Sequence, residues 1–411
     1  MRAVSEPGAA GPYLKRGRGV AVVLVIAGVV GGAVAVAPRA HRAPGAAVSA
    51  AAPVADAGHH DAGTLALEDA SSLTPESADA APPPPPYLEL DGGTLAERNE
   101  ALLTNMQNAL GLGPAAMDAV RAIFKGSDWI GQGNPKPTTH PLTRAECLER
   151  RAHASRVAPA DLRCGAPNMV PLYDPSAGES AATAKQCIDQ FEFPNIECEY
   201  PVVWVRANEA QELCHALGKR LCDAHEWEGA CAGAIKSPDS EYAWGERRIM
   251  MQYLHNLHRE IVWSYGKEKN HALCATGSKK GPKCLVPTWG GCGSNDYPAG
   301  SFPDCVSPLG VYDLNGNAAE HMNFPRKPEE LGSRGGSGET EMKGSWFIFL
   351  QGEAHEDDCR WRAPDWHVTR IDDTNSHRNY HLGFRCCKDL EGTDAGASLS
   401  VPRVEDGGTA R

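Results

Sequence analysis

The arrangement of apolar and polar positions divides the chain into four kinds of segment. An uncharged apolar run, residues 19–37, is followed by an Ala-, Pro- and Gly-rich tract, residues 38–86, which ends in five prolines. Residues 87–390 mix periodic and irregular stretches, and residues 391–411 are polar. The tract predicts a disordered linker that ends in an extended polyproline spacer, and the last residues predict a disordered tail. About 300 residues remain for a folded part, enough to bury most of its apolar surface.

The apolar run 19–37 is long enough to cross a bilayer as a helix. Lys15, Arg16 and Arg18 precede it, which favours a cytoplasmic N-terminus, residues 1–18. Small residues near its end also resemble cleavage sites, so a cleaved signal peptide is the alternative. The sequence predicts a single-pass cell-membrane protein whose main domain is periplasmic or extracellular, with the membrane as one partner.

Two amphipathic helices are predicted within residues 87–126, where apolar residues recur at helical spacing. Gly111 and Gly113 end the first helix, and Pro114 suits the first turn of the second. We expect this helical hairpin to pack on the main domain through the apolar stripes Leu95, Leu102, Leu103, Met106 and Leu110, and Met117, Val120, Ile123 and Phe124. The pattern indicates no function for it.

The following residues predict one strand and two helices. Residues 200–205 are β-branched and aromatic, which favours a strand, and residues 207–217 follow as a helix. A second helix is expected from Asp223, because Glu226 three residues later completes a capping box, and Gly233 ends it. Residues 234–345 are rich in Gly, Pro and Asn and predict ordered loops.

The 14 cysteines favour disulfides and an oxidising compartment. No pair of C-x2-C motifs is present, so a zinc module is not expected, and a net charge of −12 disfavours a nucleic-acid partner. Cys222 and Cys231 lie at opposite ends of one predicted helix, about 13 Å apart, too far to pair with each other. The set expected in disulfides is Cys187, Cys198, Cys214, Cys222, Cys231, Cys359, Cys386 and Cys387, with Cys386 and Cys387 reaching different segments and Cys359 pairing with one of those two.

Three segments, GKRLCDAHEWEGAC (218–231), GVYDLNGNAAE (310–320) and HLGFRCC (381–387), resemble the formylglycine-generating enzyme family, also called the sulfatase-modifying-factor family. The resemblance covers roughly residues 127–390. It implies an α+β, C-type-lectin-like fold that is rich in loops and stapled by disulfides. In this chain the hairpin and the transmembrane helix precede that domain.

The family's oxidase activity depends on two copper-binding cysteines after a Gly-Ser-aromatic strand. In this chain the corresponding segment is KGSWFIFLQGEAHEDDC, and alignment puts either Ile348 and Glu353 or Thr340 and Ser345 at the two positions. A longer loop brings only Cys359 near the second. Copper(I) prefers two thiolates, so the resemblance implies the fold without formylglycine formation.

The resemblance also implies a structural calcium ion held by Asp313 and Glu320 and by the carbonyls of Gly316 and Ala318. Two carboxylates and backbone oxygens suit this cation.

The loop 346–381 carries a predicted binding surface for an unknown protein or small molecule, comprising Trp361, Arg362, Trp366, His367, His377 and His381. Its histidines suggest the alternative of a non-haem iron oxidoreductase. Iron or copper is not the expected outcome. The leading prediction is a membrane-tethered, non-catalytic binding module.

Overall fold

The computed structural model describes residues 87–89, 92–154, 160–332, 338–363 and 369–390. Its helices are α1 (Leu95–Leu110), α2 (Pro114–Gly126), α3 (Arg144–Ala152), α4 (Ala207–Ala216), α5 (Ala224–Ala232), α6 (Pro238–Glu241) and α7 (Arg248–His258). Its strands are β1 (Met169–Leu172), β2 (Gln186–Asp189), β3 (Arg220–Leu221), β4 (Ala319–Asn323), β5 (Glu339–Lys343), β6 (Thr369–Arg370), β7 (Leu382–Phe384) and β8 (Cys386–Asp389).

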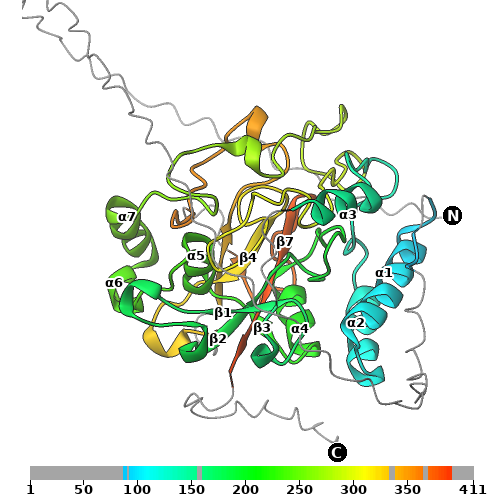
Figure 1. The fold of residues 1–411 in the computed structure, drawn as a ribbon. Helices are drawn as coiled ribbons and strands as arrows, with labels where there is room; N and C mark the ends of the chain where they lie inside the picture. The colour runs from blue at the N-terminus through cyan, green and yellow to red at the C-terminus, as the bar shows by residue number, and fades with distance from the viewer. Residues whose placement is uncertain (1–86, 90–91, 155–159, 333–337, 364–368, 391–411) are drawn as a thin grey trace, which may run out of the picture. The chain divides into compact units, whose positions relative to one another are not determined.

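The strands form two small sheets that meet at the C-terminal part of the fold (Figure 1). One sheet has the order β1-β2-β8-β3 and is antiparallel; the other has the order β6-β5-β4-β7, with β4 and β7 parallel. Only Arg385 separates β7 from β8. The closing segment of the described chain therefore belongs to both sheets, and the α+β, loop-rich class is confirmed.

The helical hairpin forms as predicted. Thr94 caps α1 in a capping box with Glu97, Gly111 ends it in the left-handed conformation, and Pro114 opens α2. α2 packs against α4, and both hairpin helices share a buried apolar cluster with Phe193, Leu213 and Phe384. The hairpin is therefore an integral wall of the domain, on the side away from α6 and α7 in Figure 1.

The prediction of a strand at residues 200–205 is wrong. Val202, Val203 and Trp204 are buried, but their N–H groups donate to the carbonyls of Phe193, Gly131 and Asn379. Three different partner segments cannot make a ladder, and Trp204 has a φ of 57°. The β-branched run is a core-crossing loop rather than a strand.

The two helices expected in residues 207–233 are confirmed, including the capping box of Asp223 and Glu226 and the C-cap at Gly233. α7 was missed. Its side chains Ile249, Tyr253 and Leu257 are exposed, so the apolar stripe of the helix does not face the core.

Seven disulfides use all 14 cysteines. The pairs are Cys147–Cys198, Cys164–Cys187, Cys214–Cys386, Cys222–Cys387, Cys231–Cys359, Cys274–Cys305 and Cys284–Cys292. All eight residues predicted to be bonded are bonded, and they occupy the first five of these pairs. Cys222 and Cys231 do not pair with each other, as expected.

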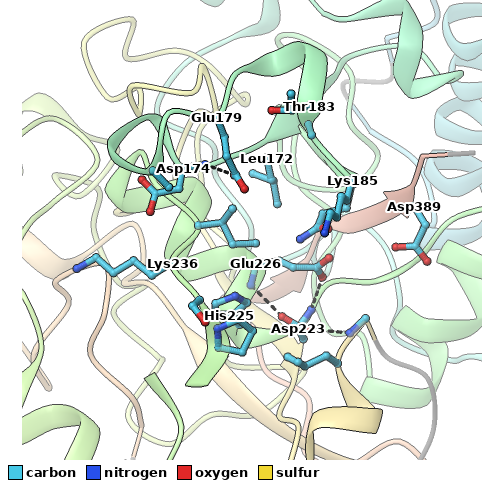
Figure 2. Close-up of a pocket in the computed structure, with 18 of the residues that line it drawn as sticks. Leu172, Asp174, Glu179, Thr183, Lys185, Asp223, His225, Glu226, Lys236 and Asp389 are labelled. Carbon is cyan, nitrogen blue, oxygen red and sulfur yellow. Dashed lines mark hydrogen bonds between the residues drawn. The ribbon is translucent and has the colours of Figure 1, made fainter. Parts of the chain in front are cut away.

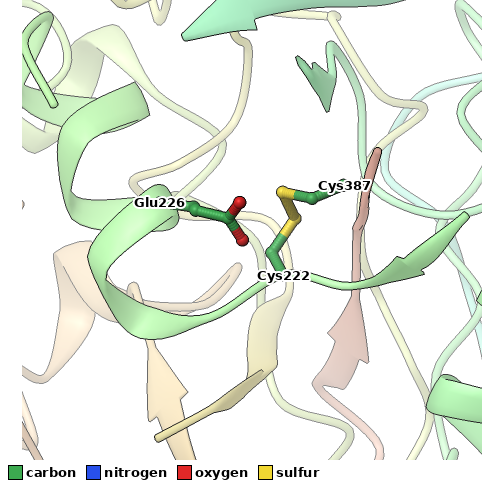
Figure 3. A group of neighbouring side chains, drawn as sticks. All are labelled: Cys222, Glu226 and Cys387. Carbon is green, nitrogen blue, oxygen red and sulfur yellow. A yellow bond between two sulfur atoms is a disulfide. The ribbon is translucent and has the colours of Figure 1, made fainter. Parts of the chain in front are cut away.

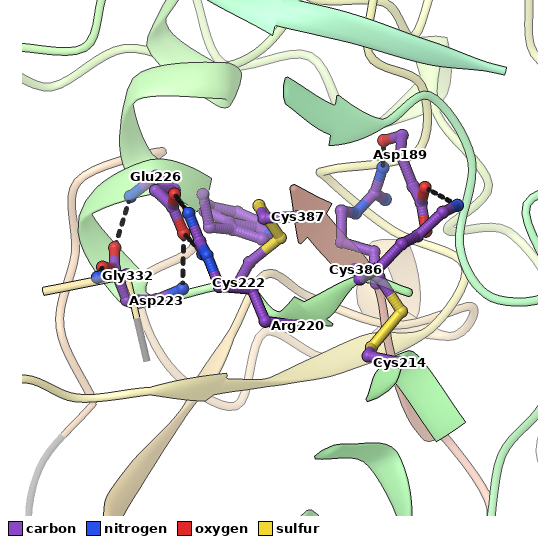
Figure 4. Close-up of a disulfide and its surroundings, with 12 residues drawn as sticks. Asp189, Cys214, Arg220, Cys222, Asp223, Glu226, Gly332, Cys386 and Cys387 are labelled. Carbon is purple, nitrogen blue, oxygen red and sulfur yellow. Dashed lines mark hydrogen bonds and ion pairs between the residues drawn. A yellow bond between two sulfur atoms is a disulfide. The ribbon is translucent and has the colours of Figure 1, made fainter. Parts of the chain in front are cut away.

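The predicted pairing of Cys359 with Cys386 or Cys387 is wrong, because Cys359 bonds to Cys231. Successive side chains of a strand point to opposite faces. Cys386 therefore reaches Cys214 on α4, while Cys387 reaches Cys222 before α5 (Figure 4). Both partners that Cys359 was expected to use are taken from the two sides of β8.

No helix among the described ranges is long and apolar enough to span a bilayer. The predicted span 19–37, the linker 38–86 and the tail 391–411 lie outside those ranges.

Candidate functional site

The segment that follows β5 begins with a glycine that the fold requires. Gly344 has a φ of 76°, and a Cβ there would lie 3.0 Å from the carbonyl oxygen of Leu314. Ser345 is buried next to it, donates to Asp357 Oδ2 at 2.9 Å and accepts from the N–H of Gly316 at 2.9 Å. The start of the segment is thus fixed against the 310–320 loop.

None of the positions expected for the copper-binding pair offers a thiol. The cysteine nearest along the chain, Cys359, is buried and bonded to Cys231. Since the seven disulfides account for every cysteine, no thiolate is available for copper(I) in the oxidised protein.

Aromatic and imidazole rings occupy this segment instead, and we call them the Trp346 cluster: Trp346, Phe349, His355, Trp361 and His381. Trp346 stacks on His381 with 4.4 Å between ring centroids, and His355 stacks on Trp361 at 4.6 Å with nearly parallel planes. Trp346 and His355 are 5.5 Å apart and join the two stacks, with Phe349 against both.

The Trp346 cluster is only partly covered, since Trp346, His355 and Trp361 are half-buried. Burial is the largest influence on His355 and lowers the pKa of its imidazole, which favours the neutral ring. Trp346 Nε1 is buried without a hydrogen-bond partner among the described residues. A half-covered group of flat rings with a spare donor suits a binding partner with an apolar face and an acceptor.

The six residues predicted for the binding surface lie in different environments. Trp361 and His381 lie in the Trp346 cluster, and His377 is exposed. Trp366 and His367 fall outside the described residues.

The prediction that Arg362 lies on the binding surface is wrong. It is fully buried, and its guanidinium binds both carboxylate oxygens of Glu228, with Nε–Oε1 at 2.9 Å and Nη2–Oε2 at 3.1 Å. Lys343 approaches the same carboxylate at 2.9 Å. Arg362 was predicted to lie on the surface because its loop is polar, but its charge neutralises the buried carboxylate of Glu228.

The predicted calcium loop has donors that only partly suit the ion. Asp313 is buried; its Oδ2 accepts from the N–H of Gly300 at 2.5 Å, and its Oδ1 has no hydrogen-bond partner in the described chain. Glu320 forms a two-armed ion pair with Arg385, at 2.6 and 2.7 Å. Asp313 thus offers a free ligand atom, whereas Glu320 has to share its oxygens with Arg385.

Sequence reasoning missed Glu192 at this loop. Its buried carboxylate accepts from the N–H of Ala318 at 2.7 Å and from the Asn317 amide at 2.6 Å. Nothing in the local sequence distinguishes this acid, because it reaches the loop across more than 120 positions of the chain.

Two carboxylates near the histidines of the 346–381 loop, Asp357 and Asp358, are already engaged by protein groups. Asp357 accepts from Trp263 and Ser345 and lies 3.1 Å from the ring of His271, while Asp358 pairs with Arg259.

Cys222, Glu226 and Cys387 are the one group of metal-ligating residue types within mutual reach in the described part of the chain (Figure 3). Its two sulfurs form a disulfide, and Glu226 is paired with Arg220 at 2.5 Å. The group is therefore a structural joint and not a metal site.

A cavity of about 500 Å³ lies beside this joint, between the start of α5 and residues 172–186 (Figure 2). Some of its polar groups pair with one another: Asp223 caps α5, Glu226 pairs with Arg220, and His225 lies 2.8 Å from Glu241.

Comparison with known proteins agrees with the geometry. Residues 139–390 match the sulfatase-modifying factor enzyme 1-like domain. The inactive Cα-formylglycine-generating enzyme 2 of Bos taurus is 29% identical over 189 residues, covering 46% of this chain and 50% of that protein. The Mus musculus protein of the same name is 30% identical over 189 residues, covering 46% and 49%. The chain thus spans about half the length of these curated relatives.

Among solved structures, one titled "Crystal Structure of CarF" aligns with 54% of this chain and 93% of its own, at 14% identity and a TM-score of 0.29. A likeness at that level adds nothing to the assignment. The family match covers well over half of the chain, so the protein belongs to the sulfatase-modifying-factor, or formylglycine-generating enzyme, family.

Proposed function

We propose that this protein is a non-catalytic binding module of the formylglycine-generating enzyme family, tethered to the membrane by residues 19–37. The observation that carries the proposal is the complete use of its cysteines in disulfides, which leaves no thiolate pair for copper. The curated relatives it matches are named inactive enzymes, which supports the same conclusion at distant identity.

The seven disulfides indicate an oxidising compartment outside the cytoplasm. An uncleaved span with a stiff spacer after it holds the domain near a membrane while leaving its surface accessible. This arrangement suits a receptor or a scaffold for a protein or small molecule better than a released enzyme.

The Trp346 cluster is the contact surface of the proposal. It stands where the family carries its catalytic loop. Its rings are partly exposed beside an indole N–H that has no hydrogen-bond partner in the described part of the chain. Buried aromatic anchors contribute most to binding when a partner excludes water from them. Calcium bound through Asp313 belongs to the proposal as a structural ion that stiffens the neighbouring loop.

The test is a peptide-oxidation assay with a Cys-x-Pro-x-Arg peptide, in the presence and absence of copper(I), followed by mass spectrometry. We expect no loss of the cysteine thiol to formylglycine under either condition. Tryptophan fluorescence on the same samples measures peptide binding, with Trp346→Ala as the comparison. Formylglycine above the no-protein background would overturn the proposal.

A further inference from the structure

A second cavity lies where the helical hairpin meets the main domain, far from the Trp346 cluster along the chain. It has a volume of about 250 Å³ and is bounded by residues 87–89, by α1 and by Glu199 and Tyr200. The hairpin and residues 87–89 lie outside the part of the chain that matches the family. The cavity is therefore a feature that this chain adds to the family fold.

Glu199 lines the cavity and has no cationic partner among the described residues. Glu199 is 4% exposed; its Oε1 accepts from Gln132 Nε2 at 2.6 Å and from the N–H of Tyr200 at 2.9 Å. Its Oε2 is buried and has no hydrogen-bond partner in the described chain. A buried carboxyl oxygen without a hydrogen-bond partner is unusual, so in a cavity wall it marks a position where a ligand can bind.

Two arginines also line the cavity. Arg144 lies over the ring of Tyr87 at 3.6 Å, and its Nε has no hydrogen-bond partner among the described residues. Arg98 donates to the carbonyl of Gly92 at 3.2 Å. Leu88 and Leu102 contribute apolar wall.

The cavity is closed by a strap, residues 87–89, that is held in place by one amide. Asn105 Oδ1 accepts from the N–H of Leu88 at 2.9 Å, and its Nδ2 donates to the carbonyl of Leu88 at 2.9 Å. A single side chain thus fixes the backbone of the strap and places Tyr87 and Leu88 on the cavity.

We propose that this cavity binds a free α-amino acid with an apolar side chain, its ammonium group at Glu199 and its carboxylate at Arg144. Its volume suits a molecule of this size, and no three metal-ligating groups of the described chain lie within mutual reach here.

Proton release provides a readout that a purely structural role would not produce. Burial is the largest influence on Glu199 and raises the pKa of its carboxyl to about 8, so the group is mostly neutral at pH 7. An ammonium ligand favours the carboxylate, and binding at pH 7 should then release close to one proton. The other ionisable groups that face the cavity are Tyr87, Glu89, Arg98, His140, Arg144 and Tyr200, with Asp296 behind His140.

The experiment is isothermal titration calorimetry on the full chain, with L-leucine as the probe, in two pH 7 buffers of different ionisation enthalpy. We expect saturable binding and proton release. 3-Methylbutylamine lacks the carboxylate and 4-methylpentanoate lacks the ammonium group, so the first should bind more weakly and the second not at all.

Three variants complete the test, each checked for a cooperative unfolding transition well above the temperature of the titration. Glu199→Gln should weaken leucine binding by at least about tenfold and abolish proton release. Arg144→Gln should weaken leucine binding to the level of the amine and leave the amine unaffected, and Glu149→Gln, an exposed acid on α3, should change nothing. Absent leucine binding, wild-type binding in Glu199→Gln, or equal binding of 4-methylpentanoate would overturn the proposal.

Discussion

Two buried acids, Glu228 on α5 and Glu199 in the cavity wall beside the hairpin, differ in whether cations compensate their charge. Burial alone would raise the pKa of Glu228, but Arg362, Lys343 and His255 together hold it well below its usual range. Among the described residues, Glu199 meets only the Gln132 amide and a backbone N–H, and burial raises its pKa to about 8. A compensated acid stabilises the fold, whereas an uncompensated acid in a cavity wall indicates a place for a ligand.

Replacing Arg362 should lower the free energy of unfolding more than any other substitution that tests this comparison. Arg362→Ala removes one of the two cations that face Glu228 and leaves a buried, undercompensated carboxylate. We expect the free energy of unfolding to fall by about 3–5 kcal/mol. Denaturant unfolding measures it, and Arg370→Ala, which breaks an exposed pair with Asp372, should have no measurable effect. Equal stability of both variants would mean that Glu228 does not depend on Arg362.

Glu199 should give a pH dependence of the opposite sign to that of a salt-bridged acid. Its pKa in the folded state is above the ordinary value, so the folded protein holds a proton that the unfolded chain releases. The contribution of Glu199 to the free energy of unfolding therefore falls as pH rises from about 5 to about 8, by an amount on the order of 3 kcal/mol.

Glu199→Gln should lose that decline while keeping the acceptor for Gln132 and Tyr200. Unfolding curves of both proteins across this interval, compared as a difference, isolate the carboxyl from the other titrating groups. Parallel curves would show that Glu199 is ionised in the fold at neutral pH.

The strap should give the smallest effect. Asn105→Ala removes both hydrogen bonds to Leu88, which costs about 1–3 kcal/mol if the Leu88 groups stay buried and less if the strap lifts into water. Limited proteolysis should then cut near residues 87–92 sooner than in the unmodified protein. Asn108→Ala, at an exposed position on the same helix, is the matched control. Unchanged cleavage would show that the strap is held by other contacts.

The sequence predicted the parts of the fold that local rules govern. Thr94 and Gly111 mark the start and the end of α1, and Asp223 and Gly233 mark the start and the end of α5. The family motifs identified the domain. It failed where partners are remote. Residues 200–205 have strand composition but hydrogen-bond to three separate segments, and the partner of Cys359 depends on which faces of β8 are already used.

The site was predictable only in part for the same reason. Trp361 and His381 were found because aromatic rings in a polar loop are conspicuous in a sequence. Arg362 was misassigned because its partner, Glu228, is 134 positions away. Glu199 was not predicted as a site residue, because nothing in the local sequence shows that this acid is buried or that it lines a cavity beside the hairpin.

The most direct test of the central claim, a family domain without the family's thiol chemistry, is a count of free thiols. The unreduced protein would be unfolded in denaturant with an alkylating reagent present, and labelled cysteines identified by mass spectrometry. We predict that none of the 14 cysteines is labelled. Stoichiometric labelling of a cysteine pair, above all Cys231 and Cys359, would contradict the account and restore a thiolate site for copper.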